Sequence, residues 1–126
     1  MTERLAVYRC PLCGNVVEVL HAGVGQLICC GRPMLRLAQS TAESRRAMHE
    51  PVVERTADAL RVTVGCEPHP MEDKHQIEWI EVRTDTDVFR RFLAPGQRPE
   101  LELPAASGDV TVVAYCNVHG IWRNQA

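Results

Sequence analysis

The segment Cys10-Pro11-Leu12-Cys13-Gly14 decides how the first part of this chain folds. Two cysteines separated by two residues form a knuckle that can place both sulfurs on one metal ion. Fifteen residues separate Cys13 from a second pair, Cys29-Cys30-Gly31. A glycine after each pair lets backbone N–H groups turn toward the sulfurs. The spacing therefore predicts a four-thiolate metal site made by Cys10, Cys13, Cys29 and Cys30.

Four thiolates at tetrahedral corners suit either zinc or iron, and the cluster alone leaves both metals open. Zinc here would be purely structural, whereas iron would be redox-active. The adjacent pair Cys29-Cys30 differs from the second two-residue-spaced knuckle of an ordinary zinc ribbon. Because neighbouring side chains diverge, we expect a strained site, which favours a specialised role.

The residues around these cysteines form a unit that is too small to fold by hydrophobic burial alone. Its β-prone runs are short: Ala6–Arg9, Val16–Leu20 and Leu27-Ile28. A unit of under about 40 residues usually needs a metal, disulfides or a partner subunit. The polar segment from Ala38 to Ser44 that follows is typical of a linker. Ser40 and Glu43 have capping-box spacing, but we expect no more than one helical turn there.

The composition of the 126 residues is that of a globular protein, with 45% hydrophobic and 24% charged residues. A net charge of −2 and an aromatic content of 5% argue against a nucleic-acid partner. No apolar run is long enough for a membrane span, and Glu3 and Arg4 interrupt any signal peptide. We therefore expect a cytoplasmic protein without a membrane partner. Cytosolic thiols stay reduced, so six cysteines there indicate metal ligation or catalysis rather than disulfides.

After the linker the sequence changes to recurring apolar, β-prone runs. There are six of them: Val52-Val53, Leu60–Val64, Ile77–Val82, Val88–Leu93, Leu101–Leu103 and Val110–Tyr115. In one run Leu60, Val62 and Val64 alternate with polar residues, which is the period of a half-buried strand. Pro95-Gly96 is typical of a turn. Regularly spaced strands without helical periodicity predict an antiparallel β-sandwich.

A second group of possible metal ligands lies in this half: His49, His69, His75, Cys116 and His119. Pro68 and Pro70 fix the backbone on both sides of His69, and Cys116 and His119 share one tight turn. Taken singly, each histidine could be an ordinary surface or hydrogen-bonded residue. Together, nitrogen and thiolate donors suit iron, zinc or copper. Five such ligands are too many for a tetrahedral zinc site and leave one position of an octahedron open.

The order of these motifs resembles the desulfoferrodoxin family, the two-iron form of superoxide reductase. The resemblance rests on six segments that span nearly the whole chain in the family's order: Tyr8–Asn15, Val17–His21, Cys29–Met34, Val64–Met71, His75–Glu81 and Tyr115–Trp122. It implies a mainly β protein with a small desulforedoxin-like metal domain over residues 1–37. It also implies an immunoglobulin-like antiparallel β-sandwich over residues 38–126.

The resemblance further implies ligands, activity and partners. A desulforedoxin-like iron would be held by Cys10, Cys13, Cys29 and Cys30. A second, catalytic iron would be held equatorially by His49, His69, His75 and His119, with Cys116 as axial thiolate and the sixth position open. Members of the family reduce superoxide to hydrogen peroxide with electrons from rubredoxin-type donors. They commonly form homodimers.

This chain departs from the family beside the second site, where the usual Glu-Lys-His is Ala47-Met48-His49. The family's lysine supplies positive charge near the open position, and its glutamate can occupy that position in the ferric state. We therefore expect slower superoxide capture with a weaker dependence on salt. Arg45, Arg46 and Lys74 could supply part of the missing charge, although a solvated face is their more ordinary role.

Two other functions are compatible with the sequence. The protein could be a non-catalytic iron protein for electron transfer or redox sensing, weakened by the change at Ala47-Met48, or it could be a zinc-binding module. Retention of all nine candidate ligands favours the enzyme, because a structural descendant needs only the first four. We expect Cys66 to be a small buried side chain at a strand end. We expect His21 to be a hairpin residue rather than a ligand.

Overall fold

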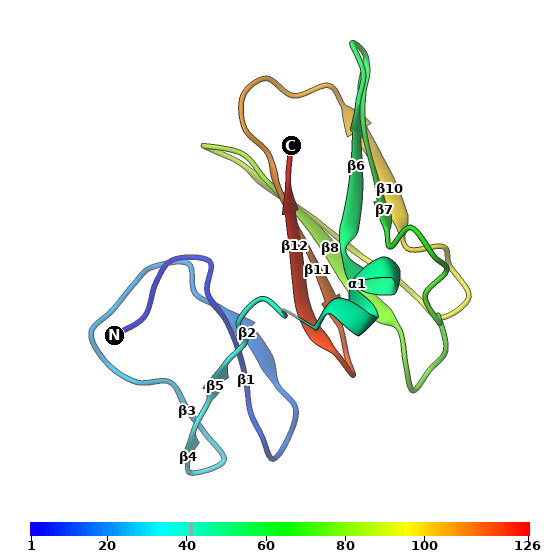
Figure 1. Cartoon of the computed structure of the whole chain (residues 1–126). Coiled ribbons are helices and arrows are strands. Elements are labelled where there is room, and N and C mark those ends of the chain that lie inside the picture. Colours follow the sequence, from blue (N-terminus) through cyan, green and yellow to red (C-terminus); the bar gives the residue numbers. More distant parts are fainter. Residues whose placement is uncertain (41) are drawn as a thin grey trace. The chain divides into compact units, whose positions relative to one another are not determined.

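The computed structural model describes residues 1–40 and 42–126, in two compact units, Met1–Ala38 and Gln39–Ala126. Both units are rich in strands, as Figure 1 shows. The mainly β fold predicted from the sequence is therefore confirmed. Thr41, which belongs to the predicted linker, lies outside the described residues. Within the described residues, no helix has both the length and the apolar character that a membrane crossing needs.

The first unit consists of five very short strands. The strand β1 (Val7–Arg9) lies between β2 (Val16–Glu18) and β5 (Leu35–Arg36), and β3 (Ile28–Cys29) pairs with β4 (Arg32–Pro33); all pairs are antiparallel. The strands β4 and β5 were not predicted, because each contains only two residues and so has no recognisable periodic pattern.

The core of this first unit is very small. Its buried side chains are Thr2, Ala6, Val7, Cys10 and Val19. Burying a large apolar side chain stabilises a fold by about 1.5–3 kcal/mol, whereas ordering each residue costs about 1–2 kcal/mol in backbone entropy. A core of this size cannot order the unit by itself.

The second unit contains two antiparallel sheets, with strand orders β10-β7-β6 and β12-β11-β8-β9. The first sheet consists of β6 (Pro51–Arg55), β7 (Ala59–Val64) and β10 (Glu100–Pro104). The second sheet consists of β8 (Ile77–Arg83), β9 (Val88–Phe92), β11 (Thr111–Cys116) and β12 (Gly120–Gln125).

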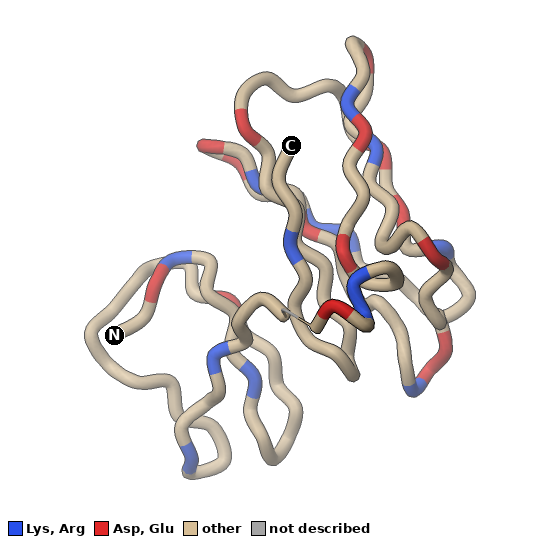
Figure 2. Tube along the Cα trace, viewed as in Figure 1, with Lys and Arg blue, Asp and Glu red and all other residues tan. Residues whose placement is uncertain are grey.

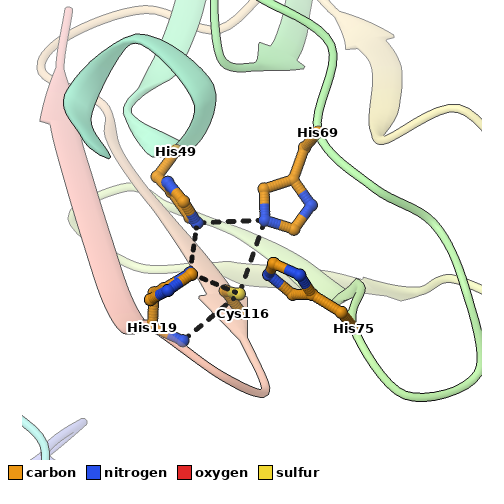
Figure 3. Close-up of side chains that lie close together, drawn as sticks. All are labelled: His49, His69, His75, Cys116 and His119. Carbon is orange, nitrogen blue, oxygen red and sulfur yellow. Dashed lines mark hydrogen bonds between the residues drawn. The ribbon is translucent and has the colours of Figure 1, made fainter. Parts of the chain in front are cut away.

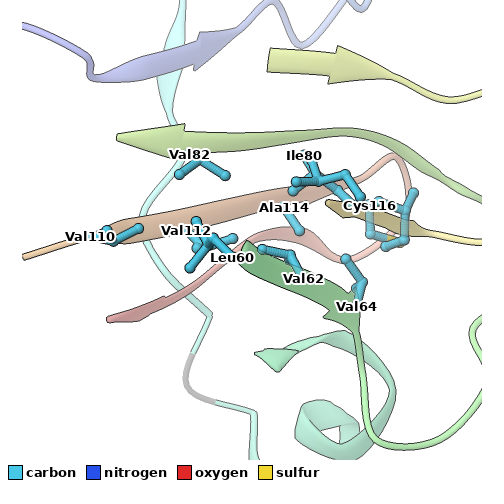
Figure 4. Packing of buried hydrophobic residues seen from close by; sticks show 11 residues of the cluster. Leu60, Val62, Val64, Ile80, Val82, Val110, Val112, Ala114 and Cys116 are labelled. Carbon is cyan, nitrogen blue, oxygen red and sulfur yellow. The ribbon is translucent and has the colours of Figure 1, made fainter. Parts of the chain in front are cut away.

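One hydrophobic core holds these two sheets together (Figure 4). From β7 it receives Leu60, Val62 and Val64, which are buried in the alternating pattern that the sequence predicted. From the other sheet it receives Ile80 and Val82 of β8 and Val112, Ala114 and Cys116 of β11. Cys116 is the last residue of this inward row on β11. The core therefore leads directly to one of the candidate metal ligands.

The strand β12 was missed by the sequence analysis. Its only large apolar residues are Ile121 and Trp122, and they lie between Gly120 and the polar residues Arg123–Gln125. The segment therefore lacks the alternating pattern that predicts a strand. Pairing with β11 from Thr111 to Cys116 gives this segment its strand conformation. Non-local pairing of this kind leaves little local pattern.

The helix α1 (Glu43–His49) corrects a second prediction, because it begins inside the proposed linker and exceeds the single turn that we expected. Ala42 occupies the N-cap position without a side-chain cap. The hydroxyl of Ser40 accepts a hydrogen bond from the Ala42 N–H at 3.4 Å, so no capping box forms. The helix is stabilised instead at its other end, where His49 is buried.

Candidate metal centres

The four cysteines of the first unit lie together, with all of their sulfur atoms within 4.8 Å of one another. The sulfur of Cys29 is 3.5 Å from that of Cys13 and 4.0 Å from that of Cys30. Sulfurs bound at about 2.3 Å to one tetrahedral ion are about 3.8 Å apart. The observed spacing therefore fits a tetrahedral metal site.

A sharp turn of the backbone allows two adjacent cysteines to reach the same point. Cys29 ends β3, and Cys30 and Gly31 follow with left-handed φ angles of 54° and 71°. For a residue other than glycine this conformation costs about 1–2 kcal/mol. The strain that we expected from two adjacent cysteine ligands is therefore located in the backbone of Cys30.

Hydrogen bonds within the cluster set the proton affinity of these thiols. The N–H groups of Cys13 and Leu12 both donate to the sulfur of Cys10 at 3.4 Å and lower its pKa to about 6. Hydrogen bonding with Cys13 raises the pKa of Cys29, and it raises the pKa of Cys30 to about 12. The four crowded thiols do not all ionise by themselves. A bound cation would supply the positive charge that four thiolates need.

The second group of candidate ligands comes from four parts of the second unit. His49 is the last residue of α1, His69 and His75 lie in the connection from β7 to β8, Cys116 ends β11, and His119 precedes β12. Their potential ligand atoms all lie within 4.8 Å of one another. Of the five candidate ligands, His49 is the one that belongs to a helix.

The four imidazoles form a ring, as Figure 3 shows. Going round it in the order His49, His69, His75, His119 and back, the ring centroids are 4.5, 4.8, 5.1 and 4.9 Å apart. The Nε2 atom of His49 is 3.0 Å from Nε2 of His69 and 3.1 Å from Nδ1 of His119. Nitrogens at about 2.1 Å from one ion are about 3.0 Å apart at right angles and about 3.4 Å apart at tetrahedral corners. The ring therefore fits four equatorial positions around an ion better than it fits a tetrahedron.

Cys116 adds a fifth donor to this ring. Its sulfur is 3.4 Å from Nε2 of His69 and 3.9 Å from Nδ1 of His119. Its side chain is fully buried and belongs to the hydrophobic core, so the thiol reaches the ring from the core. Among the described residues, no sixth donor joins the group. Five donors of this kind would leave one position of a six-coordinate ion unfilled.

Hydrogen bonds on the outer side of two rings direct their inner nitrogens toward the centre. The Nδ1 atom of His49 donates to the carbonyl of Arg45 at 2.7 Å, and that of His69 donates to the carbonyl of Pro70 at 2.6 Å. Burial lowers the pKa of His69 to about 4 and also lowers the pKa of His49 and His119. These imidazoles are neutral near pH 7, which is the state that binds metals.

Two groups in the ring lack the partner that a metal ion would provide. The Nε2 atom of His75 is buried and has no hydrogen-bond partner in the described part of the chain. Burial raises the pKa of the Cys116 thiol, although the N–H of His119 donates to its sulfur at 3.3 Å and opposes that shift. A central cation would satisfy the first group and ionise the second. Four imidazole nitrogens and one thiolate are donors that suit iron.

Gly65 brings the end of α1 and the connection carrying His69 together. Its φ is +79°, and a Cβ atom at this position would lie 2.6 Å from both the carbonyl carbon and the oxygen of Met48. The Gly65 N–H donates to the carbonyl of Glu50 at 3.1 Å. Because Met48 and Glu50 flank His49, the position of that imidazole depends on the absence of a side chain at residue 65.

Two residues near the ring were missed by the sequence analysis. Trp122 stacks on His49, with ring centroids 4.8 Å apart and planes at 22°. It lies on β12, the strand that the sequence did not reveal, so its contact could not be foreseen. Asn117 forms hydrogen bonds to the residues on both sides of His75. The only signal for Asn117 was its place between two candidate ligands.

The prediction that Cys66 is buried is wrong. It follows the left-handed turn at Gly65, and its side chain is exposed, with the thiol donating to the carbonyl of Ala47 at 3.4 Å. The turn directs Cys66 away from the core that β7 lines. His21 is also exposed, and it belongs to neither group of ligands among the described residues.

Known proteins resemble this chain along its whole length. The sequence profile of the desulfoferrodoxin N-terminal domain matches residues 2–37, and the desulfoferrodoxin profile matches residues 40–125. The desulfoferrodoxin of Syntrophotalea carbinolica is 47% identical, covering 99% of each chain. A superoxide reductase structure from Treponema pallidum matches with a TM-score of 0.75 at 24% identity, covering 98% of this chain and 99% of that one.

A shorter structure matches part of the chain at higher identity. It is a variant of the superoxide reductase (neelaredoxin) from Ignicoccus hospitalis, with a TM-score of 0.58, 30% identity, and coverage of 71% of this chain and 86% of that one. Both family profiles and the full-length relative carry the name of the same family. The chain therefore belongs to the desulfoferrodoxin family.

Proposed function

We propose that this protein reduces superoxide to hydrogen peroxide at an iron ion held by His49, His69, His75, His119 and Cys116. The observation that carries the proposal is the ring of four imidazoles with a buried thiol as fifth donor and, among the described residues, no sixth donor. Such a set leaves one coordination position for a small molecule. Structures named as superoxide reductases share the fold, and the relative from Ignicoccus hospitalis does so at 30% identity.

The reaction balances with one electron and two protons for each superoxide anion. Iron in the ferrous state, if held by these donors, would supply the electron, and the two protons would come from the solvent. The Cys116 thiolate would donate electron density to an iron ion bound by the ring. The outer hydrogen bonds of His49 and His69 hold their rings in place, so the site needs little rearrangement during the reaction.

Positive charge near the site comes from Arg45, in our proposal, in place of the family's lysine. Arg45 lies one helical turn before His49, on the same face of α1. In addition to burial, its charge lowers the pKa of both His49 and His119, so its guanidinium acts on the ring. The described residues offer Arg45 no ion pair, whereas Arg46 pairs with Glu43 at 3.1 Å and with Glu50 at 3.0 Å. Of these two arginines, Arg45 is therefore the one available to attract an anion.

The charges on the rest of the surface do not attract superoxide strongly. Basic and acidic residues are interspersed in each unit, as Figure 2 shows, and the net charge is −2. With Ala47 and Met48 in place of the family's glutamate and lysine, capture should be slower and less dependent on salt than in relatives that keep the lysine.

The four-cysteine site, in the same proposal, holds a second iron that stores or relays electrons. Residues 1–37 then form the thiolate-iron domain and residues 38–126 the superoxide-reducing domain. A rubredoxin-type protein supplies the electron that restores the ferrous state. Reduced thiols at the four-cysteine site suit the cytoplasm.

A homodimer would stabilise the small first unit. Its exposed apolar side chains include Leu12, Leu20, Val24, Ile28 and Leu35. A second copy of the chain could cover them, which would add the apolar burial that this unit lacks.

The competing function is a non-catalytic iron protein that transfers electrons or senses redox state. The replacement of the family's glutamate and lysine by Ala47 and Met48 favours it, because both residues lie beside the open position in the family. Stopped-flow mixing of the reduced, iron-loaded protein with superoxide separates the two functions. A reductase forms one hydrogen peroxide for each superoxide without releasing oxygen. Absence of any reaction would support the competing function.

A control variant distinguishes reaction at the ring from reaction at the thiolate iron. His75→Ala removes one donor from the ring and leaves the four cysteines untouched. Superoxide reduction should be lost in this variant while the absorption of the four-cysteine iron is retained.

A further inference from the structure

The imidazole of His75 has little support of its own. It lies in the connection between β7 and β8, outside any helix or strand. Its backbone exchanges hydrogen bonds with Glu72, at 3.0 and 3.2 Å, which closes a small turn. The rings of His49 and His69 are each held by a hydrogen bond to a backbone carbonyl. The described residues provide no such bond for the ring of His75, so another group has to hold this part of the chain.

Asn117 contacts the chain on both sides of His75. Its Oδ1 atom accepts a hydrogen bond from the Gln76 N–H at 2.9 Å, and its Nδ2 atom donates to the carbonyl of Lys74 at 3.0 Å. Its own N–H donates to the carbonyl of Gln76 at 3.2 Å. Three hydrogen bonds therefore join Asn117 to the two neighbours of His75.

The position of Asn117 in the chain gives these hydrogen bonds their significance. It follows Cys116 directly and precedes His119 by two residues, in the turn between β11 and β12. Its side chain thus joins the part of the chain that carries two donors to the part that carries a third. An amide is suited to this task because one short side chain offers both an acceptor and a donor.

We propose that Asn117 is a positioning residue that clamps His75 against the turn carrying Cys116 and His119, and thereby sets the geometry of the five iron ligands. The inference rests on the proposed function, because it assigns Asn117 a role at the same site. Asn117 does not itself touch the metal in this proposal; it acts through His75.

Asn117→Ala tests the clamp, because it removes both side-chain hydrogen bonds and keeps the backbone one. We expect the affinity of the ring for Fe²⁺, measured by competition with a chelator, to fall by about 10- to 100-fold. The sulfur-to-iron charge-transfer band of the ferric protein should shift, because the ligands surround the ion less regularly. The absorption of the four-cysteine iron should stay unchanged. In the zinc-loaded protein, the amide hydrogen of Gln76 should exchange faster with solvent.

Two further variants separate positioning from general stability. Asn117→Asp keeps the acceptor for Gln76 and loses the donor to Lys74, so Gln76 should remain protected while the Fe²⁺ affinity falls by about tenfold. If Asn117→Ala fails to fold, Asn117→Asp alone still tests the proposal. Val112→Ala removes side-chain volume from the core row of β11, away from the ring. It should lower stability and leave the Fe²⁺ affinity and the charge-transfer band unchanged.

Unchanged Fe²⁺ affinity together with unchanged exchange of Gln76 in Asn117→Ala would overturn the proposal. Equal losses of affinity in Asn117→Ala and Val112→Ala would also overturn it, because they would trace the effect to stability. If the wild-type protein does not react with superoxide but Asn117→Ala still weakens the binding of Fe²⁺, the reductase function is rejected. The positioning role of Asn117 is then still supported.

Discussion

The two groups of metal ligands are assembled in opposite ways. In the first unit the four cysteines come from two short segments, and few side chains are buried around them. In the second unit five donors come from four segments spread from His49 to His119, and they are attached to a core between two sheets. The comparison indicates that the metal organises the first unit, whereas the fold of the second unit organises its metal site.

Removing the metal from the first unit should have the largest effect of any change considered. Cys10→Ser deletes the buried cysteine of the cluster. Structural metal binding to four-ligand zinc-finger peptides contributes on the order of 10 kcal/mol, far more than the core of this unit supplies. We expect residues 1–38 to unfold while the second unit stays native, which amide hydrogen exchange measured by NMR would show. Cys66→Ser, an exposed position, is the control and should leave both units folded.

Slowly exchanging amides that persist throughout the first unit of Cys10→Ser would contradict this contrast. They would mean that the unit folds without its metal, as the second unit does.

Gly65→Ala should produce the next largest effect, this time in the second unit. The new Cβ atom would meet the Met48 carbonyl at 2.6 Å in a left-handed backbone, so the free energy of unfolding should fall by about 2–5 kcal/mol. Gly108→Ala is the matched control, since its φ of +78° is similar but no atom lies within 4 Å of the new Cβ. It should cost only about 1–2 kcal/mol in chemical denaturation. Equal losses in the two variants would show that the close approach at Gly65 is unimportant.

Acid should weaken the metal-free second unit, because burial in its ring lowers the pKa of His69 and so favours the neutral imidazole. The pKa of His69 is about 4 in the fold and about 6.5 in the unfolded chain. Between these values the unfolded chain binds a proton that the folded one does not, so the stability present above pH 6.5 falls as the pH is lowered towards 4. The expected loss from His69 is about 3 kcal/mol at most. Urea denaturation at several pH values would measure it, and His69→Gln should flatten the profile.

A metal-free protein whose stability does not change between pH 6.5 and 4 would contradict the idea that the fold holds the ring ready for metal.

The smallest effect should come from surface charge near the ring. Arg45→Gln should slow the reaction with superoxide by roughly two- to fivefold at low ionic strength, because a cation near the site is lost. Arg46→Gln, which removes a charge already paired with Glu43 and Glu50, should change the rate much less. Pulse radiolysis over a range of salt concentrations would measure both variants. A larger effect at Arg46 than at Arg45 would reverse the assignment.

Local sequence patterns predicted much of this molecule. The spacing from Cys10 to Cys30 indicated a compact metal cluster, and the alternation from Leu60 to Val64 indicated a strand with one buried face. Both patterns arise from neighbours along the chain, so a single sequence contains them. The five donors of the second site could be named, and the structure brings their ligand atoms within 4.8 Å of one another.

Features that depend on distant partners could not be predicted in the same way. The strand β12 exists because it pairs with β11, and α1 forms because its C-terminal residue, His49, is buried within the second unit. The contact of Trp122 with His49 depends on both elements. The exposure of Cys66 follows from the left-handed turn at Gly65. Glycine is needed at that turn because the backbone of Met48 lies too close for a side chain. In each case the cause lies in tertiary structure.

The arrangement of five donors around one ion is the central claim, and anomalous diffraction at the iron edge from crystals of the reduced, iron-loaded protein tests it most directly. We predict one iron within the second unit, bonded at about 2.1 Å to one nitrogen each of His49, His69, His75 and His119. The sulfur of Cys116 should bind on one side, and no protein atom should bind on the other. An iron bound tetrahedrally, or one that lacks either Cys116 or two of the imidazoles, would contradict the account.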